Sequence, residues 1–289
     1  MANLTLIRGG GDLASGVALR LVRSGLSVLI SELPKPLAVR RSVSFAEAVY
    51  AGQIEVEGAI GRLVNKEQIP DTLKAGVIPI IVDPEASILN DPFYSKTDSA
   101  FQLTVLVDAR LTKHAPEPLI APVKLHIGLG PGFEAGQNCH AAIETRRSHT
   151  LGRVYWHGRT QPDSGLPEGD ARRVLRAPID GTLAAFAEIG AHVEAGQVIA
   201  EILPKTVSIQ GQGTAPSKVK APFSGILRGL IHPGIQVYAG LKIGDVDPRD
   251  DPIACRLVSD KALAVGGAVL EAILSQPEIR ASLWKKELQ

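Results

Sequence analysis

The feature that most constrains the fold is a run of three glycines directly after a short apolar segment, NLTLIRGGGDLASG at residues 3–16. The apolar run predicts a strand, and apolar residues at helical spacing from Leu13 to Leu21 predict an amphipathic helix after the glycines. A strand, a glycine turn and a helix in this order present backbone N–H groups and the positive end of the helix dipole to an anion.

The same segment matches the dinucleotide fingerprint G-x-G-x-x-A at Gly9, Gly11 and Ala14. A second apolar run at residues 26–30 ends at Glu32, about twenty residues after Gly11, where a dinucleotide site places a ribose-binding acid. We therefore predict a phosphate contact at Gly9, Gly10, Gly11 and Asp12, with Glu32 on a hydroxyl-bearing group. The alternative is a glycine-rich connection that binds nothing.

Length and charge restrict the class of protein. The chain has 289 residues, enough for two domains. Its 31 Lys and Arg residues balance 30 Asp and Glu residues, so we expect neither nucleic acid nor an anionic membrane as its main partner. Two cysteines cannot form a disulfide framework, and the first apolar run lacks the features of a signal peptide, so we expect a cytoplasmic protein.

Several apolar runs in the first half predict buried strands of a mainly parallel sheet, at residues 77–82, 103–107 and 125–127. Ligands bind outside the carboxyl ends of such strands. The residues at those ends complete the predicted site: Asp83, Asp108, Gly130 and Gly132. Arg40 and Arg41 follow the second strand and predict contacts with anionic groups, the alternative being two solvated arginines.

Cys139 follows the second glycine-rich turn, GLGPGFEAG at residues 128–136, and precedes His140. A thiolate beside a histidine can act as a nucleophile, whereas a buried cysteine is inert. Adjacent cysteine and histidine do not have zinc-ligand spacing, so no metal site is predicted. Cys139 is the candidate catalytic residue, with an inert buried thiol as the alternative.

The second half of the chain contains a repeat. APIDGTL at residues 177–183 matches APFSGIL at residues 221–227, an offset of 44 residues (221 − 177), and glycines and valines further along match at the same offset. Two such units predict a small β domain, because neither can bury its apolar face alone. The pattern resembles the biotinyl/lipoyl hammerhead domain. That family carries its cofactor on a lysine in a Met-Lys or Asp-Lys context, whereas Pro204 precedes Lys205 here.

The chain as a whole resembles the accessory protein family of the selenium-dependent molybdenum hydroxylase system. Six motifs carry the resemblance: GGGDLASG (9–16), SELPKPLAVRRSVSFAEAV (31–49), GLGPGFEAG (128–136), IETRRSHTLG (143–152), IGDVDPR (243–249) and SDKALAVGGAVLEAIL (259–274). The resemblance implies a cytoplasmic maturation factor for a molybdenum hydroxylase. It is more distantly similar to the accessory proteins of xanthine dehydrogenase, which are linked with insertion or sulfuration of the molybdenum cofactor.

The predicted fold is an α/β protein: a Rossmann-like, mainly parallel sheet domain, a β-rich hammerhead domain and a C-terminal helix. The predicted divisions are residues 1–152, a linker at 153–172, the repeats at 173–248 and a helical segment at 249–289. The predicted function is maturation of a molybdenum hydroxylase, with a nucleotide or the molybdopterin cofactor as ligand. The predicted partner is the apo-hydroxylase, and a homo-oligomer is left open. The alternatives are an NAD(P)-dependent oxidoreductase and a carrier domain modified on Lys205.

Overall fold

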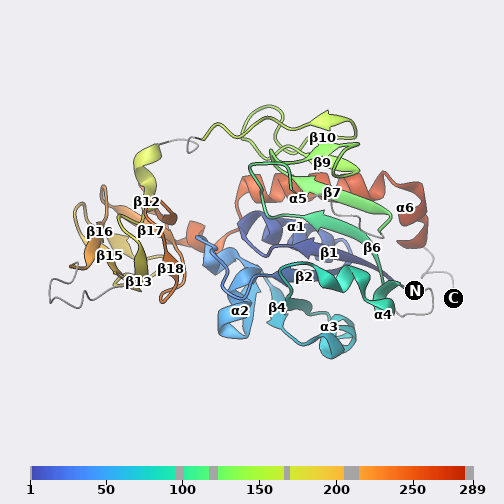
Figure 1. Cartoon of the computed structure of the whole chain (residues 1–289), viewed down its shortest axis with the longest axis horizontal. Helices are drawn as coiled ribbons and strands as arrows, with labels where there is room; N and C mark the ends of the chain where they lie inside the picture. The colour runs from blue at the N-terminus through green and yellow to red at the C-terminus, as the bar shows by residue number, and fades with distance from the viewer. Residues whose placement is uncertain (1, 96–100, 117–122, 166–169, 205–214, 284–289) are drawn as a thin grey trace. The chain divides into compact units, whose positions relative to one another are not determined.

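The computed structural model describes residues 2–95, 101–116, 123–165, 170–204 and 215–283. The chain divides into two compact units, each described here by itself (Figure 1). Unit 1 contains residues 1–36, 44–164 and 258–289, and unit 2 contains residues 37–43 and 165–257. No helix in the described part of the chain is long and apolar enough to cross a membrane.

Unit 1 is built on a nine-stranded sheet with the order β10-β9-β7-β6-β1-β2-β5-β4-β3. Its strands are β1 (Ala2–Arg8), β2 (Ser27–Glu32), β3 (Gln53–Val56), β4 (Ala59–Leu63), β5 (Ile78–Val82), β6 (Phe101–Asp108), β7 (Leu125–Leu129), β9 (Ala141–Ile143) and β10 (Val154–Tyr155). The central strands pair in parallel, whereas β3 and β10 pair antiparallel with their neighbours. A separate two-stranded ribbon joins β8 (Glu134–Ala135) to β11 (Gly158–Arg159).

Helices and apolar clusters cover this sheet. The helices of unit 1 are α1 (Asp12–Arg23), α2 (Ala48–Ala51), α3 (Ile69–Lys74), α4 (Pro92–Ser95), α5 (Asp260–Leu274) and α6 (Pro277–Leu283). Leu4, Leu6 and Leu29 of the sheet pack in one buried cluster with Ile69 and Ile88. α1 and α5 contact each other, and α1 lies against β1 and β2, whereas α5 lies against β7, β9 and β10 (Figure 1).

The contact between α1 and α5 depends on two glycines without side chains. A Cβ on Gly16 would lie 2.5 Å from the carbonyl oxygen of Ala262, and a Cβ on Gly266 would lie 2.5 Å from the carbonyl oxygen of Gly16. The Ser259 hydroxyl accepts the N–H of Ala262 and caps α5, as the sequence predicts. The backbones of α1 and α5 therefore touch directly.

Unit 2 consists of two four-stranded antiparallel sheets with the orders β12-β19-β17-β14 and β16-β15-β13-β18. The strands are β12 (Val174–Arg176), β13 (Gly181–Ala185), β14 (His192–Val193), β15 (Val198–Leu203), β16 (Ser217–Lys220), β17 (Gly225–Leu230), β18 (Gln236–Val237) and β19 (Lys242–Asp247). β14 of the first repeat pairs with β17 of the second, and β18 of the second pairs with β13 of the first. Each repeat therefore completes the sheet of the other.

The hydrogen bonds of unit 2 follow the same exchange. The N–H of Gly190 donates to the carbonyl of Leu227, and the equivalent N–H of Gly234 donates to the carbonyl of Leu183. The repeat predicted from sequence is thus a pseudo-symmetric pair in the structure. Each half supplies hydrogen-bond partners that the other half lacks.

The predicted fold class was wrong. The large sheet is mixed, with antiparallel ribbons at both edges, and unit 2 is a pair of antiparallel sheets rather than the predicted hammerhead domain. A doubly wound domain needs helical crossovers between its parallel strands. The described residues between β6 and β7, and between β7 and β9, form no helix, because this stretch is rich in glycine and proline. Lys205, the alternative carrier residue, lies outside the described residues.

The two glycines in α5 give a matched test of the close helix contact. We expect Gly266→Ala to destabilise the protein by about 1–3 kcal/mol, because the new methyl group would overlap the backbone of α1. Gly267 has nothing within 4 Å of its Cβ position, so Gly267→Ala is expected to be stabilising by about 0.5–1 kcal/mol through helix propensity. Urea unfolding of both variants measures the difference. Equal effects would contradict the close contact.

Candidate functional site

The first glycine turn is filled by the chain's own groups. Gly9 has a φ of +95° and donates its N–H to the carbonyl of Ser31 at 2.8 Å. Gly10 donates its N–H to Glu32 Oε2 at 2.6 Å and accepts the N–H of Ala46 at 2.8 Å. A Cβ on Gly10 would lie 2.9 Å from the Ala46 nitrogen. These glycines therefore permit close packing of the segment that carries Ala46.

Glu32 turns back onto the turn rather than towards solvent. Its carboxylate also accepts the N–H of Leu33 at 2.6 Å, and the residue is 8% exposed. Burial raises the pKa of Glu32, and the two N–H donors oppose this shift. Gly11 and Asp12 lie at the start of α1, and a Cβ on Gly11 would have nothing within 4 Å. Glu32 thus occupies the Gly10 donor that the sequence assigned to a phosphate.

The other predicted residues at the sheet edge make internal contacts. Asp83 accepts the N–H groups of Ser87 and Ile88, both at 2.9 Å. Gly130 donates to the carbonyl of Ile143, and Gly132 donates to the carbonyl of Thr112. These contacts stabilise loops at the carboxyl ends of the strands. The predicted ligand contacts of these residues stay untested.

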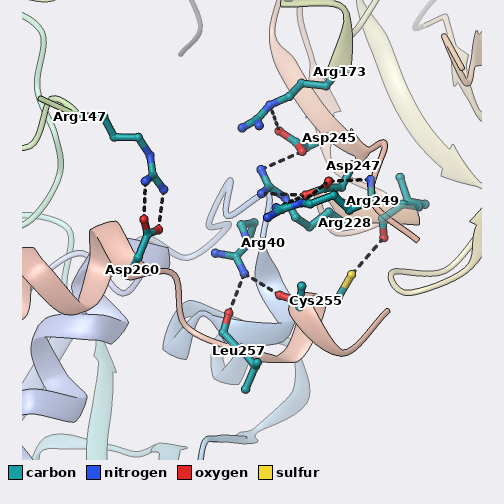
Figure 2. Close-up of polar contacts among 12 residues, drawn as sticks. Arg40, Arg147, Arg173, Arg228, Asp245, Asp247, Arg249, Cys255, Leu257 and Asp260 are labelled. Carbon is teal, nitrogen blue, oxygen red and sulfur yellow. Dashed lines mark hydrogen bonds and ion pairs between the residues drawn. The ribbon is translucent and has the colours of Figure 1, made fainter. Parts of the chain in front are cut away.

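Arg40 and Arg41 belong to unit 2, whereas the glycine turn belongs to unit 1. Arg40 donates to the carbonyls of Leu257 and Ala254 at 2.8 and 3.2 Å (Figure 2). Arg41 donates to the carbonyl of Leu230 at 3.0 Å. Both guanidinium groups hold backbone segments of unit 2 together.

Cys139 is buried in a small apolar cluster with Phe133, Ala135 and Ala142. Burial raises the pKa of its thiol to about 11. Almost no thiolate exists at neutral pH under these conditions. The position of Cys139 therefore favours the inert alternative over the catalytic one.

A row of polar side chains crosses the carboxyl edge of the unit 1 sheet. In the strand register Arg8 of β1 pairs with Ser31 of β2 and with Asp108 of β6, and Asp108 pairs with Gly128 of β7. Residues paired in this way share a face of the sheet, as does His126, two residues before Gly128. We call Arg8, Ser31, Asp108 and His126 the edge row.

Three groups of the edge row are buried and lack a hydrogen-bond partner among the described residues: Arg8 Nε, Ser31 Oγ and His126 Nε2. Arg8 is 8% exposed, Ser31 1% and His126 5%. A buried polar group without a partner costs about 1–3 kcal/mol. Three such groups on one face of the sheet, on β1, β2 and β7, call for a physical explanation, such as a ligand that completes them.

The two charged residues of the edge row, Asp108 and Arg8, differ in the ion pairs that they form. Asp108 is 1% exposed and binds Arg110 through two bonds, Nε–Oδ1 at 2.9 Å and Nη2–Oδ2 at 2.6 Å. This pairing raises the pKa of Arg110. Arg8 has only a 3.6 Å contact with Glu85, whose side chain is 88% exposed, and a hydrogen bond to the carbonyl of Pro84. Burial and the neighbouring Arg110 lower the pKa of Arg8, and Asp108, Glu85 and Asp83 oppose this shift.

His126 is neutral at physiological pH. Burial, the largest cause, lowers its pKa to about 4, and Asp108 opposes that shift. A neutral imidazole can donate or accept a hydrogen bond at Nε2, depending on its tautomer. His126 can therefore serve a polar ligand without adding charge.

The loops beside the edge row contain strained backbone. Ala86 follows β5 and has a φ of +53°, and Leu111 follows β6 and has a φ of +58°. Non-glycine residues rarely adopt this left-handed conformation, which costs about 1–3 kcal/mol and concentrates at functional sites. Both outliers lie after parallel strands that end at this edge.

The sequence prediction missed Arg8, Ser31 and His126. The available signal was a polar residue inside or at the end of an apolar strand, as in LTLIR, VLIS and LHI. Among the described residues, no group of three or more His, Cys, Asp or Glu side chains could hold a metal ion.

Comparisons with known proteins show what this chain is similar to. No protein-family model matches the chain. The uncharacterized protein YqeB of Escherichia coli (strain K12) is 41% identical over 278 residues, which cover 94% of this chain and 47% of YqeB. The chain thus spans about half the length of the curated relative that it matches.

Solved structures align only distantly. An aspartoacylase family protein from Mesorhizobium loti is 12% identical with a TM-score of 0.29, covering 85% of this chain and 84% of that protein. The product-bound ectoine utilization protein EutE of Ruegeria pomeroyi is 14% identical with a TM-score of 0.27, covering 85% of each. A succinylglutamate desuccinylase/aspartoacylase from Rhodobacter sphaeroides is 13% identical with a TM-score of 0.27, covering 85% and 87%. Such scores are too low to carry an argument about this chain.

These comparisons overturn the predicted identification. The relative found by sequence is named as the uncharacterized protein YqeB, and its name does not point to a molybdenum hydroxylase accessory protein. The prediction of selenium-dependent molybdenum hydroxylase maturation was wrong. The predicted apo-hydroxylase partner is tested by no observation here.

The buried thiols give a first prediction for this site. We expect both Cys139 and Cys255 to resist a thiol reagent in the folded protein at pH 7.5, because burial raises the pKa of each thiol. Both should react at once in 6 M guanidinium, which serves as the control. Stoichiometric labelling of native Cys139 within seconds would contradict the buried, protonated thiol.

His126 gives a second prediction, through the pH dependence of stability. Its pKa is lowered to about 4 in the folded chain and is about 6.5 when unfolded, so the unfolded state binds more protons between these values. Stability is therefore lost as pH falls. The expected loss from this group between pH 7.5 and pH 5 is about 2 kcal/mol.

Urea unfolding at both pH values tests this expectation. His126→Gln should lose less stability than the parent over the same interval by that amount. His192→Gln is the matched control, because His192 is an exposed histidine of unit 2. Parallel pH dependence in the parent and His126→Gln would contradict the assigned pKa.

Proposed function

We propose that unit 1 binds a small carboxylic acid at the edge row, with Arg8, Ser31 and His126 as the direct contacts. The observation that carries the proposal is the presence of three buried polar groups, on β1, β2 and β7, that lack a hydrogen-bond partner among the described residues. An oxyanion can accept from a guanidinium, a hydroxyl and an imidazole N–H together.

The charge of the edge row supports a monoanion. Asp108 already neutralises Arg110 in a short bidentate pair, which leaves Arg8 as the cation with the weaker counterion. Neutral His126 adds no further charge. One carboxylate would restore the balance, because a charge-assisted hydrogen bond to a guanidinium offsets the cost of burying both ions.

The left-handed residues beside the edge row support a preorganised site. Ala86 and Leu111 hold the loops after β5 and β6 in conformations that the surrounding structure must maintain. Asp83 fixes the first of these loops through Ser87 and Ile88. Fixed loops reduce the entropy that ligand binding would otherwise cost.

A cytoplasmic location is part of this proposal. Cys139 and Cys255 are both free thiols, and free thiols are usual in a reducing compartment.

Calorimetric titration of the full chain with acetate, succinate and glutamate tests the proposal. At least one should bind the parent, and Arg8→Gln should weaken that binding by about ten-fold or more, because a hydrogen bond to a charged group contributes about 1.5–3 kcal/mol. Ser31→Ala, which removes one hydroxyl, should weaken it less.

Arg62→Gln is the matched control. Arg62 lies on β4 of the same sheet and donates to exposed Gln53, outside the edge row. It should bind as the parent does, and thermal unfolding of each variant checks that the fold is kept. Absence of binding by all three acids, or equal binding by the parent and folded Arg8→Gln, would reject the proposed function.

A further inference from the structure

Unit 1 contains a pocket of about 260 Å³ whose lining includes no residue of the edge row. Two short segments line it: the 3-10 turn η3 (Lys66–Gln68) with the first turn of α3, and the segment that opens α4 (Figure 1). We call it the α3–α4 pocket, and its lining residues are Lys66, Glu67, Pro70, Asp91, Phe93 and Tyr94. Ligand pockets usually measure about 300–1,000 Å³, so this one suits a small ligand.

Two aromatic rings meet in the α3–α4 pocket. The ring centroids of Phe93 and Tyr94 lie 4.9 Å apart, and the ring planes cross at 79°. Tyr94 is buried in the apolar core of unit 1, whereas Phe93 is 52% exposed. Two rings at this angle form a corner that can contact a rounded ligand on two sides. The faces of such rings are electron-rich and attract cations.

The charges that line the pocket also favour a cation. Lys66 Nζ lies 2.7 Å from Asp91 Oδ2, and Glu67 is a second carboxylate in a lining that has one ammonium group. Burial, the largest cause, and then the charges of Asp91 and Glu67 raise the pKa of Tyr94 to about 12. The hydrogen bond to Asp91, with the charges of Asp83 and Glu67, raises the pKa of Lys66. The surroundings of both residues therefore stabilise positive charge.

Hydrogen bonds hold the walls of the pocket in place. Asp91 Oδ1 accepts the N–H of Phe93 at 2.9 Å, and the Tyr94 hydroxyl donates to the carbonyl of Lys66 at 3.4 Å. The Gln68 side chain accepts the N–H of Asn65 at 2.9 Å and fixes the start of η3. Walls that are already ordered reduce the entropy that ligand binding would otherwise cost.

The ion pair of Lys66 with Asp91 leaves the aromatic corner accessible. The side chain of Lys66 is 46% exposed and that of Asp91 is 20% exposed. Phe93 remains half-exposed beside them, so its ring is available to a ligand from solvent. A ligand that covers Phe93 would also remove apolar area from water.

We propose that the α3–α4 pocket binds a small quaternary alkylammonium cation, with Phe93 as the aromatic contact and Asp91 and Glu67 as the counter-charges. A quaternary ammonium group has no N–H to satisfy, and its methyl groups suit a lining of aromatic rings and Pro70. This site is separate from the edge row, and it does not rest on the carboxylate proposal.

Calorimetric titration of the full chain with choline at pH 7.5, with sodium chloride used to hold ionic strength constant, tests the proposal. The matched ligand is 3,3-dimethylbutan-1-ol, which has the shape of choline without its charge. The parent should bind one choline per chain, and it should bind choline at least about five-fold more tightly than the neutral alcohol. Absence of choline binding, or equal affinity for the two ligands, overturns the proposal.

The contribution of the aromatic ring is tested by Phe93→Leu, which keeps an apolar side chain and removes the π face. It should weaken choline binding by about five-fold or more and change the affinity for the neutral alcohol by less than about two-fold. Phe186→Leu is the matched control, because Phe186 is an exposed phenylalanine of unit 2. Equal choline affinities of the two variants would contradict the assigned contact. Thermal unfolding checks that each variant is folded.

The charge of Lys66 gives a test of opposite sign. Lys66→Met removes the competing cation and should strengthen choline binding by about three-fold or more, because like charges a few ångströms apart repel. Lys74→Met is the matched control on α3, since Lys74 is exposed, pairs with Asp71 and does not line the pocket. Weaker choline binding by folded Lys66→Met, or the same change in both variants, would reject the proposed cation site.

Discussion

The direct backbone contact of α1 with α5 is the constraint on which unit 1 depends. Because the described chain supplies no helix between β6, β7 and β9, those strands need cover from elsewhere in the sequence. α5, from the end of the chain, lies against β7, β9 and β10 and contacts α1 through Gly16 and Gly266. A larger residue at either glycine would push the helices apart and open the apolar layer over the sheet.

Because helices cover the sheet, the polar groups of the edge row are shielded from water, and burying them costs free energy. Its strands end in a region with little solvent, so Arg8 and His126 lose hydration without gaining a full set of partners. The two groups respond differently. The imidazole remains neutral down to a pH of about 4, whereas a guanidinium keeps its charge and needs an anion. The proposed carboxylate ligand matches this difference, because it is an anion for Arg8 and a hydrogen-bond partner for neutral His126.

Local sequence patterns predicted the elements of this chain better than their assembly. The strand and helix around the first glycine turn, the C-terminal helix α5 and the 44-residue repeat are all confirmed. They depend on periodicity and capping within short segments. The mixed sheet was missed because the sequence analysis did not predict β4, which forms a hairpin with β3 through the two-residue turn at Glu57 and Gly58. The role of Gly10 was misjudged because sequence spacing cannot show that Glu32 folds back onto its N–H.

The internal repeat allows residues at equivalent positions of its two halves to be compared within one chain. Where the two halves of unit 2 agree, as at Gly190 and Gly234, the shared residue serves the exchange of strands. Where they differ, the fold tolerates either residue, and Ala184 against Arg228 is such a position. A buried arginine costs more than an alanine unless something repays its desolvation. The asymmetry of the repeat therefore identifies positions whose side chains the exchange of strands does not require.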